Sequence, residues 1–375
     1  MAQERKKRRI VLASVLKPVD DARMFEKMGV TLAQSGQYEV FIIGYPSRVL
    51  PEFPEIQFIP LPHFHRLTYR RLWAKWQVFR IVWNLKPSLL IFNTHELLVP
   101  SVLLKIFMDL RIFYDVRENY YRNILFAGSF PWFISWPIAC GVRFKEKLLA
   151  PAVEHFFLAE KGYEIEFKFH RGGWTFVENK ALTLPKPSDT RKGASDMRLL
   201  FSGTLAESTG VFQAIHLAKK LHQLDASVSL TIIGYAAKAN VLSKIRQEIQ
   251  EQPFIQLIGG DQLVPHQQIL AQIQQSDFGI LSYPYSRHTE NSLPTKLFEY
   301  LQAKLPIILE RRWPWTKRFE GYKPFIYFDF LKEDYVTLLH EIRNGQFYLK
   351  PPEDVTWDSE AVKFLGALET VGHNS

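Results

Sequence analysis

Short apolar runs alternate with segments of helical periodicity along the first half of the chain. The runs are rich in residues that favour strands, and between them apolar side chains recur with a helical period, as at Met24, Met28 and Leu32. Strands that alternate with helices at this spacing predict βαβ units and a parallel sheet. The predicted strands are Ile10–Ser14, Tyr38–Gly44, Ser88–Phe92 and Arg111–Val116, and the predicted helices are Asp20–Gln34 and Leu97–Leu110.

The same alternation starts again in the second half. The predicted strands are Met197–Ser202, Val228–Gly234, Phe254–Ile258, Phe278–Ser282 and Pro306–Leu309, and the predicted helices are Val211–Leu224 and Pro294–Gln302. We therefore expect an α/β protein with two Rossmann-like, doubly wound domains that face a cleft. Sheets of this kind bind ligands at the carboxyl ends of their strands.

A stretch rich in Pro, Ser, Gly and charge marks the expected boundary. It lies at 182–195 (LTLPKPSDTRKGAS), so we expect a first domain at 1–180, a linker at 181–195 and a second domain at 196–345. The remaining residues, 346–375, form a C-terminal extension. Its helix, at about Asp358–Val371, is expected to pack back on the first domain.

Charge separates the two halves of this chain of 375 residues. The net charge is +9, and residues 1–180 hold 26 of the 47 Lys and Arg but 17 of the 38 Asp and Glu. The whole excess therefore belongs to the first half. It favours an anionic partner there, which could be a membrane, a nucleic acid or a phosphorylated substrate. No nucleic-acid-binding motif accompanies this charge, so we expect no nucleic-acid partner.

Composition narrows the class of protein further. Apolar residues make up 47% of the chain, which is typical of a globular protein. Cys140 is the single cysteine, which excludes an internal disulfide framework and a zinc site built from cysteines. The first residues are polar and basic, unlike a secretory signal, so we expect a cytoplasmic protein.

Two segments of the first half could meet a membrane. Residues 124–142 carry no charge, but Gly128, Pro131 and Pro137 interrupt them. They could form a membrane span, a buried helix pair, or an interfacial segment, which we favour because Trp132 and Trp136 prefer an interface. A helical segment with basic and aromatic residues could lie on a membrane, line an acceptor groove, or simply pack as an amphipathic helix. Its residues are Arg66, Tyr69, Arg70, Arg71, Trp73, Lys75 and Trp76.

The segment Ser282–Tyr300 (SYPYSRHTENSLPTKLFEY) is the most informative for chemistry. A predicted strand ends there in a polar loop, and Pro294 then starts a helix, with Ser292 as its expected N-cap. Free N–H groups at such a helix start attract phosphate, Lys296 adds a positive charge, and Glu299 can reach a sugar hydroxyl. The alternative is an ordinary capped helix with a solvated Lys–Glu face.

Ten consecutive positions, Asn291 to Tyr300, resemble the donor-binding motif of family 4 glycosyltransferases. Segments at 20–25, 86–98, 114–120 and 200–210 resemble that family in the expected order, so the resemblance covers about residues 8–345. It implies the GT-B fold, a nucleotide-sugar donor and retention of configuration. It also implies that amides before the helix hold the diphosphate and that Glu299 binds the ribose.

The resemblance also implies a set of site residues. Arg117, Glu118 and His95 are expected at the reacting centre. The expected donor-binding residues are Gly203, Thr204, Arg287, Ser292, Leu293, Lys296 and Glu299.

Several positions depart from the family pattern. Arg117 stands where the family usually has a histidine, Thr204 and Thr209 stand where it has an arginine and a lysine, and Asn291 replaces a glutamate. A threonine hydroxyl stabilises a leaving diphosphate less well than a charged donor. Arg117 could replace a lost charge, or it could pair with Asp115 or Glu118.

The sequence therefore predicts a glycosyltransferase that moves a sugar from a nucleotide-sugar to a glycan or lipid-linked acceptor. We expect no metal and no cofactor beyond the nucleotide-sugar, and a possible peripheral position at the inner face of the membrane. One alternative is a weakened or inactive relative that binds a nucleotide-sugar or a partner without turnover. Another is a nucleotide-sugar epimerase, which would convert its substrate without an acceptor.

Overall fold

The computed structural model describes residues 7–47, 49–63, 70–126, 131–169, 173–183, 196–284, 293–311, 313–332 and 334–372. The chain divides into two compact units. The first combines Met1–Asn179 with Asp358–Ser375, and the second is Lys180–Trp357. The first unit therefore takes a helix from the far end of the chain.

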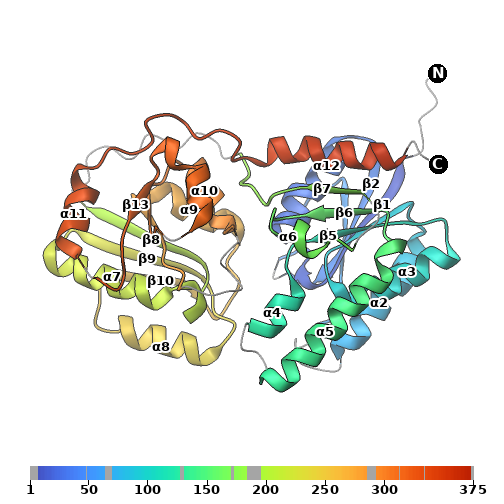
Figure 1. The fold of residues 1–375 in the computed structure, drawn as a ribbon, viewed down its shortest axis with the longest axis horizontal. Coiled ribbons are helices and arrows are strands. Elements are labelled where there is room, and N and C mark those ends of the chain that lie inside the picture. Colours follow the sequence, from blue (N-terminus) through green and yellow to red (C-terminus); the bar gives the residue numbers. More distant parts are fainter. Residues whose placement is uncertain are drawn as a thin grey trace. The chain divides into compact units, whose positions relative to one another are not determined.

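The described part of the first unit forms a parallel sheet of seven strands in the order β3-β2-β1-β4-β5-β6-β7 (Figure 1). Chain order reverses between β1 and β4, which are neighbours in the sheet. The strands are β1 (Arg8–Pro18), β2 (Tyr38–Tyr45), β3 (Ile56–Pro60), β4 (Leu89–Phe92), β5 (Arg111–Val116), β6 (His155–Leu158) and β7 (Gly173–Phe176). The helices are α1 (Val30–Gln34), α2 (Arg70–Leu85), α3 (Leu98–Phe107), α4 (Tyr120–Phe126), α5 (Trp132–Leu149), α6 (Tyr163–Glu166) and α12 (Trp357–Gly372).

The described part of the second unit repeats this architecture with six parallel strands in the order β10-β9-β8-β11-β12-β13. Here the reversal falls between β8 and β11. The strands are β8 (Met197–Thr204), β9 (Val228–Tyr235), β10 (Ile255–Gly260), β11 (Phe278–Leu281), β12 (Ile307–Leu309) and β13 (Phe325–Tyr327). The helices are α7 (Val211–Leu224), α8 (Ala239–Ile249), α9 (His266–Gln275), α10 (Thr295–Gln302) and α11 (Tyr335–Asn344).

The central strands are apolar on both faces because helices cover both sides of each sheet. Every residue of β4, β11 and β12 is buried, as a parallel sheet inside two helical layers requires. The two doubly wound domains predicted from the sequence are therefore confirmed.

The C-terminal helix α12 packs on the first unit, as expected. Phe364 meets Phe157 of β6 with ring centroids 5.2 Å apart, and the Glu360 carboxylate accepts a hydrogen bond from the Glu178 amide. In the second unit, Ala181 pairs with Thr356 and so ties the two ends of that unit together. Most of the expected linker, 184–195, lies outside the described residues.

The segment expected as one helix at Asp20–Gln34 begins with a π-helical part, Ala22–Gly29, before α1. Its buried residues include Arg23 with Lys27 and Met24 with Met28. Each pair is four residues apart, a spacing that the wider π turn keeps on one face. Such local π turns occur often at functional sites.

Pro137 does not interrupt its segment, contrary to expectation. It lies inside α5, and the carbonyl that loses its helical partner belongs to Phe133, a residue that is 62% exposed. Among the described residues, no helix is both long enough and apolar enough to cross a membrane.

Candidate functional site

The carboxyl ends of β8 and β11 meet at the point where strand order reverses in the second sheet, the usual ligand position in such sheets. Gly203 near the end of β8 has a φ of +99°, which glycine adopts without strain. Ser282 and Tyr283 directly follow β11. The two strand ends and the helices that start beside them make this the candidate donor site.

Helix α7 begins against the end of β11. Gly210 precedes α7 with a φ of +83°, and a Cβ there would lie 1.8 Å from the Ser282 carbonyl oxygen. The Ser282 hydroxyl donates to the Gly210 carbonyl over 2.7 Å. No side chain caps α7, so its first-turn amides can bind an anion beside the strand ends.

Lys296 on α10 points into this corner. Its Nζ donates to the Ser202 carbonyl oxygen over 2.6 Å and lies 4.4 Å from the centroid of the Phe201 ring and 5.1 Å from that of Tyr283. Burial lowers the pKa of Lys296 to about 7, against an opposing effect of Glu299. With a pKa near 7, the neutral amine form of Lys296 takes up a proton readily when an anion binds beside it.

Glu299 lies one turn further along α10 and bonds to His266 at the start of α9. The His266 Nε2 is 2.9 Å from the Glu299 Oε1, and because a carboxylate only accepts, Nε2 carries the proton and donates. Both side chains are largely buried. This contact fixes one oxygen of Glu299. His266 was not among the residues predicted from the sequence, although a histidine directly after Pro265 at a helix start was a visible signal.

The other expected donor residues are placed as follows. Gly203 lies beside Lys296, Thr204 is exposed at the end of β8, and Leu293 is half-buried just before α10. The Thr209 hydroxyl donates to the Thr204 carbonyl over 2.7 Å, so it is used within its own turn.

The start of α10 differs from the expectation in one respect. The helix begins at Thr295, and Pro294 is its N-cap with extended backbone and no side-chain hydrogen bond, so the predicted N-cap role of Ser292 is wrong. Ser292 and Arg287 lie outside the described residues. Their expected roles toward the donor stay predictions.

In the first unit, Arg117 follows β5 and pairs with Asp21, and not with Asp115 or Glu118, the two partners considered as one alternative above. Its Nη1 donates to the Asp21 Oδ1 over 2.7 Å, and its Nη2 to Oδ2 over 3.2 Å. Burial alone would raise the pKa of Asp21, but Arg117 outweighs it and lowers that pKa to about 2. The same pairing, against burial, raises the pKa of Arg117.

Asp115 instead forms a buried pair with Arg23, whose guanidinium nitrogens lie 2.7 to 3.1 Å from its carboxylate oxygens. Arg23 comes from the π-helical segment and Asp115 from β5, so the pair anchors the loop that carries Asp21. Arg117 and Asp21 are thereby held at the carboxyl end of the sheet.

Glu118 and Lys17 connect the ends of β5 and β1. The Lys17 Nζ donates to the Glu118 Oε1 over 2.6 Å, and Lys17 lowers the pKa of Glu118. The Asn123 amide donates to the other carboxylate oxygen over 3.2 Å. Glu118 is therefore an ionised acceptor held in place, suited to bind hydroxyl groups.

His95 follows β4 at the same edge of the sheet. Burial lowers the pKa of His95 to about 4, so its ring is neutral at pH 7. Its Nδ1 lies 2.8 Å from the Lys145 Nζ, and because an ammonium only donates, Nδ1 accepts and Nε2 carries the proton. That Nε2 lies 3.6 Å from the Glu96 Oε2. The described structure thus brings Arg117, Glu118 and His95 to one edge of the first sheet.

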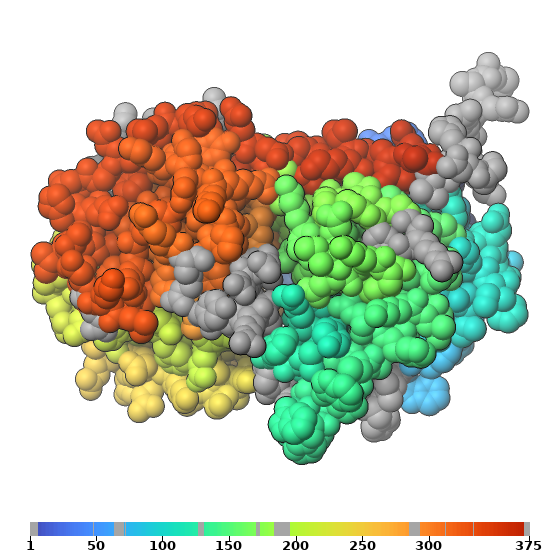
Figure 2. Space-filling view, in the orientation of Figure 1, coloured from blue at the N-terminus to red at the C-terminus, as the bar shows by residue number. Residues whose placement is uncertain are grey.

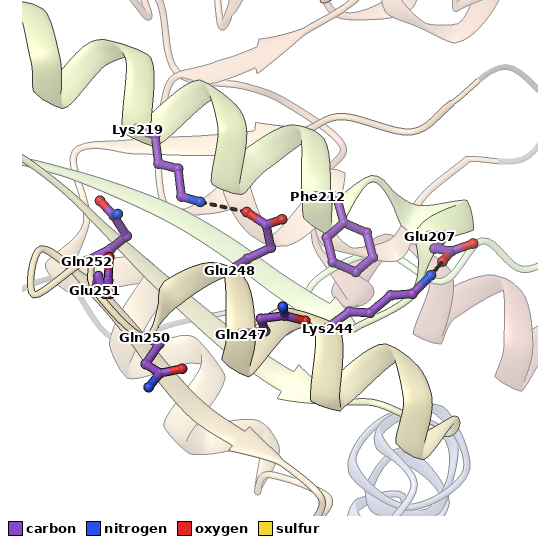
Figure 3. Close-up of a pocket in the computed structure, with 9 residues that line it drawn as sticks. All are labelled: Glu207, Phe212, Lys219, Lys244, Gln247, Glu248, Gln250, Glu251 and Gln252. Atoms are coloured by element: carbon purple, nitrogen blue, oxygen red, sulfur yellow. Dashed lines mark hydrogen bonds and ion pairs between the residues drawn. The ribbon is translucent and has the colours of Figure 1, made fainter.

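Two hollows lie away from these strand ends. One, of about 790 Å³, opens between α7 and α8 on the second unit and is crossed by ion pairs from Lys219 to Glu248 and from Lys244 to Glu207 (Figure 3). The other, of about 940 Å³, lies at the amino ends of β5 to β7 in the first unit and is lined by Arg111, His155 and Trp174 among others. Neither belongs to the candidate site.

No protein-family model and no curated protein matches the chain. Several solved structures do match the chain. Sucrose-phosphate synthase from Thermosynechococcus elongatus is 11% identical with a TM-score of 0.69, over 98% of this chain and 100% of that one. A UDP-forming α,α-trehalose-phosphate synthase from Burkholderia vietnamiensis is 9% identical with a TM-score of 0.67, over 99% and 100%.

HepE from Anabaena, solved in complex with UDP and glucose, is 12% identical with a TM-score of 0.65, over 97% of this chain and 100% of that one. The likeness extends over almost the whole of each chain, and both sheets of this chain have the parallel, doubly wound order. These neighbours are glycosyltransferases, and the chain has their GT-B fold, with two Rossmann-like domains.

Proposed function

We propose that the chain is a glycosyltransferase that moves a sugar from a nucleotide-sugar donor to a glycan or lipid-linked acceptor, with retention of configuration. One observation carries the proposal: Lys296 and the uncapped start of α7 both lie where strand order reverses in the second sheet. Glu299, which is buried, follows Lys296 three residues later on α10. A diphosphate fits the first two groups, and a ribose hydroxyl fits the third. The GT-B fold and the UDP in the HepE structure support a UDP-sugar as donor.

Departure of the nucleotide diphosphate builds negative charge on its oxygens. Lys296 and the α7 amides are preorganised to stabilise that charge, and loss of one such donor typically lowers the rate ~100-fold or more. Protein groups alone would stabilise the leaving diphosphate, without a metal ion and without a cofactor other than the donor. Turnover is then expected to survive EDTA.

We assign acceptor binding to the first unit. Glu118, ionised and held by Lys17, would accept hydrogen bonds from acceptor hydroxyls, and neutral His95 and charged Arg117 lie at the same strand ends. We also propose a cytoplasmic protein, which the lone Cys140 supports because disulfides are rare in reducing compartments.

The test of the donor site is calorimetric titration with UDP-glucose and other nucleotide-sugars. Glu299→Ala should weaken binding roughly 10- to 100-fold, because it removes a charged hydrogen-bond acceptor. The matched control is Glu341→Ala, which removes an exposed glutamate of α11 in the same unit and should leave affinity unchanged. Equal affinity of wild type and Glu299→Ala would refute the assignment.

A second candidate is a relative that binds the nucleotide-sugar without turnover. It is favoured by the Thr209 hydroxyl, which is engaged within its own turn, and by Arg117, whose guanidinium is engaged by Asp21. A panel of glycan and lipid-linked acceptors separates the candidates. A product that forms only with an acceptor supports glycosyl transfer. Conversion of the nucleotide-sugar without an acceptor identifies an epimerase, and nucleotide-sugar binding with no product over the whole panel supports the second candidate.

A further inference from the structure

Exposed aromatic side chains are distributed unevenly. Among the described residues, the large apolar side chains exposed on the second unit are all aliphatic, for example Leu331 and Val336. Those exposed on the first unit include many Trp and Phe, and all of these lie on α2, α3, α4 and α5. They are Trp73, Trp76, Trp83, Phe107, Phe126, Trp132, Phe133, Trp136 and Phe144. Exposed aromatic clusters of this kind mark interaction surfaces.

The strongest part of this surface is the amino-terminal half of α5. Trp132, Phe133 and Trp136 are 80%, 62% and 59% exposed, and the neighbouring Ile134 and Ile138 are exposed as well. We call these five residues the aromatic tip. The start of α5 projects beyond the rest of the first unit, at the bottom of Figures 1 and 2. An apolar helix end that projects in this way does not cover the core of its unit. Its shape suits insertion into an apolar environment outside the protein.

The length of this apolar end limits how deeply it can enter a bilayer. Residues 132–142 carry no charge, and Arg143, Lys145 and Lys147 follow. At 1.5 Å per residue the uncharged part is about 16 Å long, roughly half of a hydrocarbon core about 30 Å thick. It can therefore enter one leaflet and cannot cross both. Trp side chains are also those that prefer the membrane interface.

The helices that carry the exposed aromatic residues are basic, which complements an anionic surface. Helices α2 to α5 together carry nine Lys and Arg and one acidic residue, Glu146. Several of these cations are ion-paired within the first unit, but Lys75, Arg80 and Lys147 have no carboxylate partner among the described residues. Basic residues beside an apolar anchor each add to binding of anionic lipid.

The aromatic surface continues from α2 to α3, which pack against each other. Phe79 stacks on Trp83 with centroids 6.0 Å apart, and Trp83 meets Phe107 of α3 at 6.5 Å. Helix α3 also contacts α5. The exposed aromatic residues therefore belong to one connected layer of helices.

We propose that the aromatic tip anchors this chain in one leaflet of an anionic membrane, while Lys75, Arg80 and Lys147 bind lipid headgroups. The anchor is monotopic: it enters the headgroup and acyl boundary and does not span the bilayer. The proposal goes beyond glycosyl transfer and does not depend on it, because binding to lipid requires neither donor nor turnover.

The test is sedimentation of the full chain with phosphatidylcholine vesicles, with and without phosphatidylglycerol. We expect binding to the anionic vesicles that weakens with salt. The triple variant Trp132→Ser, Phe133→Ser, Trp136→Ser should lower the partition coefficient roughly a hundredfold or more, because three large apolar groups no longer leave water. The matched control is Leu331→Ser, Val336→Ser, Leu349→Ser, which removes exposed apolar residues of the second unit and should bind like wild type.

Wild-type tryptophan fluorescence gives a readout that needs no variant: brominated lipids should quench it if the tip enters the acyl region. Affinity for UDP-glucose, measured in parallel, should be equal in all three proteins, which separates this proposal from that of the donor site. Equal lipid binding by the triple variant and wild type would overturn the anchor. The anchor would also be overturned if the wild-type protein failed to bind anionic vesicles, or if it self-associated through the tip without lipid.

Discussion

At the scale of residues, Lys296 combines two opposed demands. Its buried ammonium is costly to the folded protein, which is why its pKa is lowered to about 7, and the same group is what a diphosphate needs. Functional groups often lower stability in this way. The pKa of Lys296 therefore links donor binding to pH.

Affinity for UDP-glucose should fall as pH rises above 7. A bound diphosphate stabilises the ammonium and raises the pKa of Lys296, so binding takes up a proton wherever the free protein has lost it. Below pH 7 the affinity should be flat, and above it the dissociation constant should rise by up to ~10-fold per pH unit. Calorimetry from pH 6 to pH 9 measures this.

Lys296→Arg is the control, because a guanidinium keeps its charge over this range. The variant should bind with no slope between pH 6 and pH 9. A wild-type affinity that is also flat above pH 7 would contradict the role of Lys296.

Asp21 makes the opposite kind of contribution, because its carboxylate is stabilised by folding. Its pKa falls from 3.8 to about 2, so the stability it adds is complete above pH 4 and is lost between pH 4 and pH 2. The shift is worth about 2 kcal/mol for this largely buried group. Asp21→Asn should destabilise the first unit by at least that amount at pH 7, and the difference should vanish near pH 2.

Denaturant unfolding at several pH values measures this effect. Asp261→Asn is the control, because its ion pair with Arg246 is 57% exposed on both sides and should contribute less than about 1 kcal/mol. A difference between Asp21→Asn and wild type that persists unchanged at pH 2 would contradict the ionic origin.

At the scale of elements, the contact between α7 and the end of β11 positions the amides of the donor site. Gly210→Ala should disrupt it, because a Cβ would overlap the Ser282 carbonyl and the φ of +83° disfavours alanine. We expect the second unit to lose roughly 1–3 kcal/mol of stability and the chain to lose affinity for UDP-glucose.

Gly321→Ala in the same unit is the matched control, since a Cβ there meets open space. Thermal unfolding and nucleotide titration of both variants make the comparison. If Gly210→Ala melted at the same temperature as wild type, Gly210 would not lie against the Ser282 carbonyl.

Periodicity predicted several central elements well and missed others. Helix α7 runs over Val211–Leu224 as predicted, and the buried strands β4 and β11 lie within one residue of their predicted ranges. No strand was predicted at β3, β6, β7 or β13, although β6 is buried throughout and its apolar run (HFFL) was a visible signal. In β3 only Ile56 is buried, and in β7 no residue is, so neither shows the apolar run that identifies a central strand.

At the scale of the whole molecule, charge and chemistry are divided between the two halves of the sequence. The excess of +9 belongs to residues 1–180, which also hold the aromatic tip and the cations Lys75, Arg80 and Lys147. The second half is neutral overall, yet it holds Lys296 at the candidate donor site. Net charge therefore points to the membrane proposal, while phosphate chemistry depends on one buried lysine and on helix amides.

The sequence alone determined the alternation that makes two parallel sheets, and it placed Lys296 and Glu299 one turn apart on one helix. These are local properties, set by side-chain periodicity. Only the tertiary structure decided that Arg117 pairs with Asp21, that His266 bonds to Glu299 and that Gly210 meets Ser282. Each of these partners lies more than thirty residues away in the chain, and strand order, which periodicity does not encode, brings them together.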